Sequence, residues 1–250
     1  GRIASERSRV SVMTTSNTQN LTGFVLHQRK YRDTSLIVEF FSREAGRVSL
    51  LFKGVRRPVK KSGVSLSDLR LFQRLSVQKI GRGELPLAKV IDSAFTPKVL
   101  EGYEAIIGLY VNELMVRLTG RFEVMTELFD AYERWVAEVL DQGFLQAGLR
   151  EFELTLLSEL GYGIDFGFDA ANGGEIAPDQ WYHYFPGSGF APAVDAGVLS
   201  FKGDELLRLA MGTMTVAGAQ IVKQVVRQAT HELLEGKPLR SRDLLEKARL

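Results

Sequence analysis

The chain has 250 residues, of which 45% are hydrophobic, and it carries 32 Lys or Arg against 30 Asp or Glu. A chain of this length and composition can form hydrophobic cores, so we do not expect it to be disordered. It is long enough for one large domain or two domains of ordinary size. The chain contains no cysteine, which excludes disulfides, thiolate zinc sites and thiol nucleophiles and agrees with a reducing compartment. No segment resembles a signal peptide or a membrane span, so we expect a cytoplasmic protein without a membrane partner.

The first twenty residues are polar and aperiodic. We expect residues 1–20 to form a disordered tail. The chain begins with Gly, and Met13 is a candidate genetic start, which would make residues 1–12 an artificial extension.

Five short apolar segments follow the tail, and Gly, Pro, Ser or charged residues separate them. Each is rich in Val, Ile, Leu and Phe, which is typical of β-strands. The segments cover residues 21–28, 35–42, 46–53, 72–80 and 87–93. Five strands within about seventy residues predict a small closed or nearly closed barrel, which we place at residues 21–98.

Near residue 100 the spacing of apolar residues changes to three and four, which predicts helices. The helical pattern covers residues 102–118, 126–140, 149–160, 203–211, 216–234 and 241–250. Residues 161–190 interrupt it, because they are dense in Gly and aromatic residues and have no helical period. We therefore expect a helical domain over residues 99–250, with an irregular β-hairpin insert at 161–200.

Positive charge is concentrated between Arg29 and Lys61, where ten Lys or Arg face three acidic residues. A barrel can bind a nucleic-acid strand by cradling phosphates with such cations while bases stack on aromatic rings. Aromatic residues lie within the same stretch: Tyr31, Phe40, Phe41 and Phe52. The alternative is that the three Phe side chains fill the barrel and that the charges only provide solubility.

A second candidate site lies in residues 149–163. On a helix, residues four and seven positions apart share a face, so Arg150, Leu154 and Leu157 lie on one face and Phe152, Leu156 and Leu160 on another. One apolar face belongs to the core. The other is either core as well or a pocket in which Arg150 meets an acidic peptide with an apolar end.

Metal and catalytic motifs are weak. The three histidines, His27, His183 and His231, are far apart in the sequence and lack metal-ligand spacing. The sequence therefore favours a binding protein over an enzyme, with no cofactor. Four further cations could extend the basic surface, but we expect them to lie on ordinary solvated helix faces: Arg117, Arg121, Lys223 and Arg227.

Four stretches resemble the bacterial recombination mediator RecO family, in the same order and at similar spacing. They are GFVLHQRKYRDTSLIVEFFSREAGRVSLLFKGVRR at 23–57, GLYVNELMVRL at 108–118, REFELTLLSELGYGIDF at 150–166 and GKPLRSRDLL at 236–245. The resemblance covers nearly the whole chain after residue 20. It implies an α+β protein, in which a five-stranded OB-fold barrel precedes a helical domain with a zinc-ribbon-like insert.

The resemblance also implies a non-enzymatic function in DNA repair. Members of the family bind single- and double-stranded DNA, anneal complementary strands and bind the acidic C-terminal tail of single-stranded DNA-binding protein. They help RecA to replace that protein, commonly together with RecR. The cysteine-free insert departs from the four-cysteine zinc site of many members, so no zinc is expected here. We expect aromatic packing to hold the insert instead, through Tyr162, Phe166, Trp181, Tyr182 and Tyr184.

The site residues implied by the resemblance fall in two groups. The DNA-binding group comprises Arg29, Lys30, Arg32, Arg47, Lys53, Arg56, Arg57, Lys60 and Lys61. Arg150 matches the arginine that the family presents to the acidic tail, and helical geometry adds Leu154 and Leu157. Three alternatives stay open: an RNA-binding or general nucleic-acid-binding OB-fold protein without mediator activity, a nuclease, and an adaptor that does not bind DNA.

Overall fold

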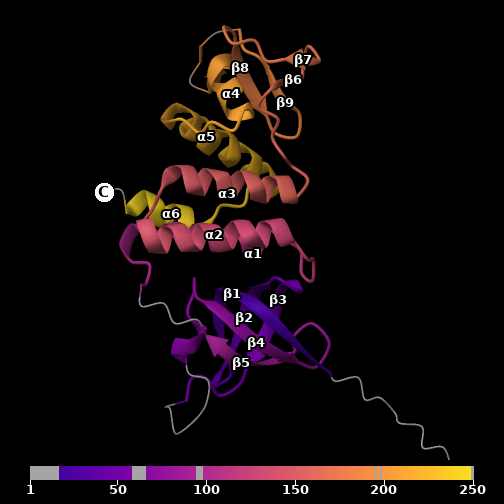
Figure 1. Ribbon diagram of the computed structural model, residues 1–250, viewed down its shortest axis with the longest axis vertical. Coiled ribbons are helices and arrows are strands. Elements are labelled where there is room, and N and C mark those ends of the chain that lie inside the picture. The colour runs from indigo at the N-terminus through magenta and orange to yellow at the C-terminus, as the bar shows by residue number, and fades with distance from the viewer. Residues whose placement is uncertain (1–16, 58–65, 94–97, 195, 198, 249–250) are drawn as a thin grey trace, which may run out of the picture.

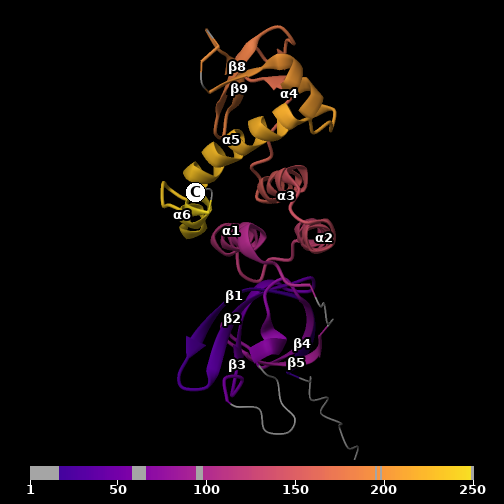
Figure 2. The ribbon, with the colours of Figure 1, turned by 90° about the vertical axis from the view of Figure 1, so that its left-hand side faces the viewer.

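The computed structural model describes residues 17–57, 66–93, 98–194, 196–197 and 199–248. These residues form a stack of layers (Figure 1). The barrel lies at one end, two helices cover it, further helices follow, and a small sheet closes the other end. Figure 2 shows the same stack from the side, with the indigo strands of the barrel reaching away from the helices.

The barrel consists of five strands and one short 3-10 helix. The bounds are β1 Thr18–Tyr31, β2 Ser35–Ser42, β3 Gly46–Phe52, η1 Leu66–Leu69, β4 Arg74–Ile80 and β5 Leu87–Ser93. The sheet is closed in the order β1-β2-β3-β5-β4. Four of the five pairings are antiparallel, whereas β3 and β5 run parallel at Leu51 and Leu87. This is the predicted OB-type barrel, and all five expected strands are present.

The interior of the barrel is filled by aliphatic residues and two Phe rings. Phe40 and Phe52 are buried there among Leu21, Val38 and Leu50. The alternation along β2 and β3 places these side chains inward, because successive residues of a strand point to opposite faces. The sequence pattern that predicted strands is therefore also the pattern that fills the core.

The described residues of the helical part form six helices. The bounds are α1 Gly102–Leu118, α2 Thr126–Gln142, α3 Gln146–Glu159, α4 Gly203–Ala210, α5 Val216–Leu233 and α6 Arg240–Lys247. Each lies within a few residues of the helix expected from apolar spacing. No helix among the described residues is long and apolar enough to cross a membrane.

The barrel and the helices share one hydrophobic core. Phe24 and Phe41 point out of the barrel, and their rings pack against Phe129 and Tyr132 of α2 at centroid distances of 5.2–6.1 Å. Gly46 begins β3 at φ +66, and a Cβ there would overlap the backbone of Glu123. The β2–β3 end of the barrel is therefore fixed against the helices; we call it the junction.

The insert is a small five-stranded sheet rather than a single hairpin. Its strands are β6 Phe168–Asp169, β7 Gly174–Glu175, β8 Trp181–Phe185, β9 Gly189–Pro192 and β10 Ser200–Lys202, in the order β10-β8-β9-β6-β7.

The insert packs on α5 through aromatic rings, which is the kind of core expected without zinc. Phe166, Tyr182 and Tyr184 are buried in this cluster, as predicted. Tyr162 and Trp181 are instead 50% and 37% exposed.

A polar turn joins β6 and β7 of the insert. The Asp169 carboxylate accepts hydrogen bonds from the backbone of Ala171 and from the backbone and side chain of Asn172. Burial acts to raise the pKa of Asp169, but these bonds outweigh it and lower the pKa. The charged carboxylate therefore fixes the turn between β6 and β7.

Candidate functional sites

Six cations gather at the end of the barrel opposite the junction. β2 separates this end from the junction by eight residues, on the order of 25 Å. Two chain segments supply the cations, namely the end of β1 with its turn and the residues after β3. We call this group the basic tip; it comprises Arg29, Lys30, Arg32, Lys53, Arg56 and Arg57.

Hydrogen bonds hold the two segments of the basic tip together. The Arg56 amide donates to the Thr34 carbonyl at 3.0 Å, and its guanidinium donates to the Arg32 carbonyl at 3.2 Å. Arg32 itself has a positive φ of 49, which suits the tight turn after β1. The two segments, which are separated in the sequence, are therefore adjacent in the fold.

The cations of the basic tip lie mostly at the surface. Five of them are exposed and Arg56 is half-buried. Among the described residues none of the six forms an ion pair; Asp33 is the acidic residue in the same turn. The result is a strongly positive edge, which is the electrostatic footprint of a polyanion-binding surface.

The aromatic residues of the stretch divide between core and surface. Phe40 and Phe52 fill the barrel and Phe41 fills the junction, each no more than 1% exposed, so the three Phe side chains are core. Tyr31 is half-buried at the basic tip, and the Arg32 guanidinium lies 5.2 Å from the centre of its ring. Of these four rings, only Tyr31 is placed where a base could stack.

Arg47 is not part of the basic tip, which corrects its grouping with the DNA-binding residues. It is 9% exposed at the junction. Its guanidinium pairs with Glu39 at 2.8 Å and donates to the Thr119 hydroxyl and carbonyl at 3.1 and 2.7 Å. Since Arg47 lies at the β2–β3 end, its neighbours are helical residues and not solvent.

Glu39 completes the junction network. Its carboxylate accepts from the Ser49 hydroxyl at 2.5 Å and lies 3.3 Å from Arg121. Burial acts to raise the pKa of Glu39, but the hydrogen bonds from Ser49 and Arg47 outweigh it and leave the pKa below its ordinary value. Lys60 and Lys61, the remaining predicted DNA-binding residues, lie outside the described residues.

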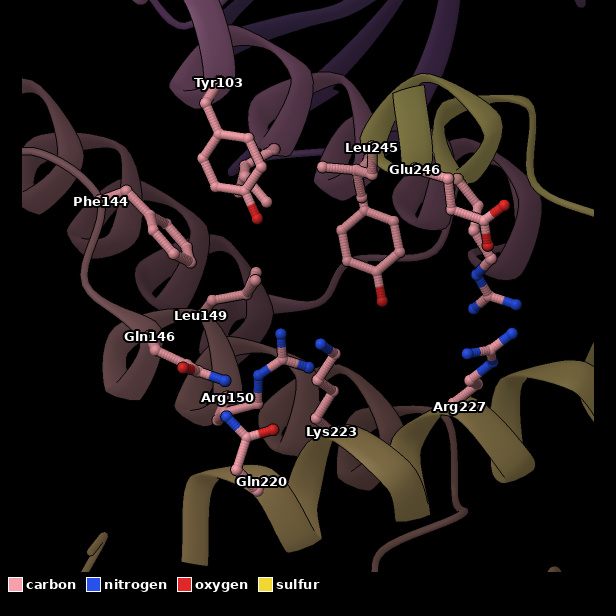
Figure 3. Close-up of a pocket in the computed structure, with 13 residues that line it drawn as sticks. Tyr103, Phe144, Gln146, Leu149, Arg150, Gln220, Lys223, Arg227, Leu245 and Glu246 are labelled. Carbon is pink, nitrogen blue, oxygen red and sulfur yellow. The ribbon is translucent and has the colours of Figure 1, made fainter. Parts of the chain in front are cut away.

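The second candidate site is a cavity of about 200 Å³ among α1, α3, α5 and α6. Figure 3 shows Arg150 of α3 beside Lys223 and Gln220 of α5, with Tyr103 and Phe144 across the cavity. We call it the Arg150 cavity. Its cations are Arg150, Lys223, Arg227 and Arg242, and its apolar wall is formed by Tyr103, Ile107, Phe144, Leu149 and Leu245.

Arg150 is held by a buried carboxylate at the base of the cavity. One nitrogen pairs with Glu153 at 2.6 Å, and the second oxygen of Glu153 accepts from the Tyr110 hydroxyl at 2.7 Å. Burial raises the pKa of Glu153, although Arg150 and Tyr110 oppose the shift. The Arg150 Nε makes no hydrogen bond with a described residue. The ion pair with Glu153 therefore fixes the Arg150 side chain at the edge of the cavity.

Leu154 and Leu157 do not line the Arg150 cavity, which corrects the predicted site. Leu157 is buried in the core that joins α3, α5 and the insert, and Leu154 packs against the same core. All three residues do share a face of α3. However, α5 and the insert cover this face at the two leucines and leave it open at Arg150. The second apolar face of α3 therefore belongs to the core.

Lys223 and Arg227 line this cavity, whereas we expected them to lie on a solvated helix face. Arg242, from α6, joins them. The four-residue spacing of Lys223 and Arg227 places both on one side of α5, and this was the available signal. The sequence could not show that this side faces Arg150, since α3 and α5 meet only in the tertiary structure.

We find no set of metal ligands in the described part of the chain. No group of three or more His, Cys, Asp or Glu residues there could hold a metal ion. The basic tip and the Arg150 cavity instead provide positive charge and apolar surface.

Comparison with known proteins gives a consistent result over both parts of the chain. A family model described as Recombination protein O N terminal matches residues 13–91, and one described as Recombination protein O C terminal matches residues 101–243. The chain is 35% identical over 223 residues to a DNA repair protein RecO of Aliivibrio salmonicida, covering 88% of this chain and 92% of that protein. It is 37% identical over 227 residues to a DNA repair protein RecO of Aromatoleum aromaticum, covering 89% and 93%.

Proposed function

The chain belongs to the RecO family of DNA repair proteins, and we propose that it is a recombination mediator that couples capture of single-stranded DNA-binding protein to strand annealing. In this proposal the basic tip binds single- and double-stranded DNA. The Arg150 cavity binds the acidic C-terminal tail of single-stranded DNA-binding protein. RecR assists the protein, and RecA is then loaded on the exposed DNA strand. The site of action would be the nucleoid in the cytoplasm.

The observation that carries the proposal is the unpaired charge of the basic tip. Annealing requires two phosphate backbones to approach each other, and cations that neutralise phosphate charge reduce their repulsion. Six cations without an acidic partner among the described residues supply this neutralisation. Because such binding releases counterions, the slope of log affinity against log salt is expected to be about −4 to −5 if each cation meets one phosphate.

The Arg150 cavity has the chemistry of an acidic peptide with an aromatic end. Tyr103, Phe144 and Leu245 supply an apolar wall for a ring. The Arg150 guanidinium lines the cavity and supplies the positive charge for a carboxylate, and charge-assisted hydrogen bonds are the stronger ones. Arg227 and Arg242 would then meet the acidic side chains.

The test is the annealing rate of complementary oligonucleotides coated with single-stranded DNA-binding protein, with and without its acidic tail. We expect acceleration only when the tail is present. Acceleration of tail-less complexes to the same extent would show that the Arg150 cavity is not needed. No acceleration in either case would leave a nucleic-acid-binding protein without mediator activity, and competition between RNA and DNA oligonucleotides would then identify its ligand.

Arg227→Ala is the sharper variant for the tail, because Arg227 is exposed and Arg150 holds a buried carboxylate. We expect a roughly 10-fold loss of tail-peptide affinity from losing one charge-assisted contact, with DNA affinity unchanged. Arg134→Ala, which removes an exposed arginine of α2 outside the cavity, is the matched control. If both variants lost the same peptide affinity, the loss would be due to the change in net charge and not to the cavity.

A further inference from the structure

A second cavity lies on the other side of α5, where the insert meets the ends of two helices. Its volume is about 330 Å³, at the lower end of the range of about 300–1,000 Å³ that is usual for small-ligand sites. The residue stretch after α3, the β8–β9 turn and the last turn of α5 enclose it. We call it the insert cavity; its side-chain lining includes Tyr162, Asp165, Phe168, Tyr184 and Glu232.

The insert cavity is negative where the Arg150 cavity is positive. Among the described residues, Asp165 and Glu232 are the two charged ones that line it, and no described Lys, Arg or His does. α3 ends at Glu159 and α5 ends at Leu233, so both helices direct their carboxyl ends toward this region. The C-terminus of a helix carries a partial negative charge. Two carboxylates and two helix ends therefore favour a cation.

Aromatic rings complete the site. Tyr162 and Phe168 line the cavity and are 50% and 43% exposed, which leaves ring surface without a packing partner. A cation over such a face is attracted by the negative face of the ring. Aromatic rings beside carboxylates are suited to a cation that also has flat apolar surface.

Tyr184 provides an unused polar group in this cavity. The residue is only 8% exposed, and its ring packs against Phe190 at 5.3 Å. Its hydroxyl makes no hydrogen bond with a residue of the described ranges. Burial, with a contribution from the nearby Glu232, raises the pKa of Tyr184. The hydroxyl therefore stays protonated, and its oxygen is available to accept a hydrogen bond from a donor that enters.

We propose that the insert cavity binds the side chain of an arginine presented by a partner protein. A planar guanidinium both stacks on aromatic rings and donates to carboxylates in pairs, which a lysine ammonium does less well. The two carboxylates repel phosphate, so nucleic acid does not fit here. α5 then serves two partners of opposite charge, an acidic peptide along Lys223 and Arg227 and a basic segment beside Glu232.

The test uses the full chain with ¹³C-labelled Tyr and titrates N-acetylarginine methylamide by NMR, with the neutral citrulline analogue as the matched ligand. We expect saturable shifts of tyrosine signals with the arginine compound and at least ~10-fold weaker binding of the citrulline compound. Equal binding of the two, or no saturable shift, would overturn the proposal. Arg150 does not line the insert cavity, so neither result would affect the proposal that the Arg150 cavity binds the acidic tail.

Glu232→Gln is the informative variant, with an expected loss of about 10-fold in affinity for the arginine compound. Glu235→Gln is the control, since it removes the same charge from the same end of α5 outside the cavity lining. Tyr184→Phe keeps the ring and removes only the hydroxyl, and a smaller loss is expected. An unchanged affinity in Glu232→Gln would contradict the assignment. Self-association of the chain that Glu232→Gln abolishes would assign the arginine to a second copy and overturn the choice of a partner protein.

Discussion

The two ends of the barrel use the same kind of residue in opposite ways. At the basic tip, exposed Arg and Lys residues have no acidic partner among the described residues. At the junction, Arg43 pairs with Asp130 at 2.5 Å and Arg74 pairs with Glu133 at 2.9 Å. Arg47 is buried and pairs with the half-buried Glu39. A count of cations along the sequence therefore overstates the charge that is available to a polyanion, because part of it joins the barrel to the helices.

The largest expected effect comes from reversing charge at the basic tip. Changing Arg29, Lys30, Lys53 and Arg57 to Glu should lower DNA affinity by about 10²–10³-fold at ~100 mM salt and make the salt slope shallower by about 3 to 4. The free energy of unfolding should change little, because these side chains are exposed. Fluorescence anisotropy at several salt concentrations and denaturant unfolding measure the two quantities.

A control with the same change in net charge distinguishes a local surface from general attraction. Arg134, Lys202, Arg208 and Lys247 are exposed in the helical part and the insert, and reversing these four should leave most of the DNA affinity. If this control loses as much affinity as the tip variant, the basic tip is not the binding surface.

At the junction, Arg47→Ala should behave in the opposite way. It leaves the half-buried Glu39 without its main partner, although Ser49 and Arg121 still contact the carboxylate. We expect a loss of about 2 kcal/mol of unfolding free energy. DNA affinity per folded molecule should be unchanged. Thermal unfolding together with anisotropy on the folded fraction measures both. Unchanged stability with weakened DNA binding would return Arg47 to the DNA-binding surface.

The pH dependence of stability should also separate the two ends. The pKa of Glu39 is depressed in the folded protein, so the unfolded state binds the proton more readily. The stabilisation from Glu39 is therefore fully present above the unfolded pKa of about 4.3 and is lost as pH falls through the lower folded value. Denaturant unfolding of the protein and of Glu39→Gln should differ at pH 6 and converge at lower pH. A constant difference across this range would contradict the assignment.

The smallest effect is expected for Arg121→Ala. Arg121 also contacts Glu39, but its side chain is 45% exposed, and exposed ion pairs contribute about 0–1 kcal/mol. We expect a loss of at most about 0.5 kcal/mol that disappears at high salt. A loss as large as that of Arg47→Ala would show that the junction depends on the whole network and not on its buried pair.

Much of the fold was predictable from local pattern. The strands at residues 35–42 and 87–93 and the helix at 102–118 have the bounds that apolar spacing predicted. Residues 18–20 lengthen β1 beyond its predicted start, because pairing with β4 orders polar residues that carry no strand pattern of their own. The insert was less predictable, since strands of two to five residues are too short to show a period.

The candidate sites were predictable only in part. The basic tip follows from charge in turns, which lie at the surface of a barrel. The Arg150 cavity combines residues of α1, α3, α5 and α6 that lie more than 140 positions apart at their extremes, from Tyr103 to Glu246. No spacing rule connects such residues, and the leucines that share a face with Arg150 proved to be core.

The sequence by itself determined the barrel strands and the helices of this protein and their order, because these depend on periodicity and composition over neighbouring residues. The family followed from the resemblance of four stretches to known proteins. Only the tertiary structure decided which charges are free. Arg47 meets Thr119 across 72 positions, and Lys223 reaches Arg150 only because α5 crosses α3. A charge is available to a ligand when no folded neighbour neutralises it, and that neighbour is set by packing and not by position in the chain.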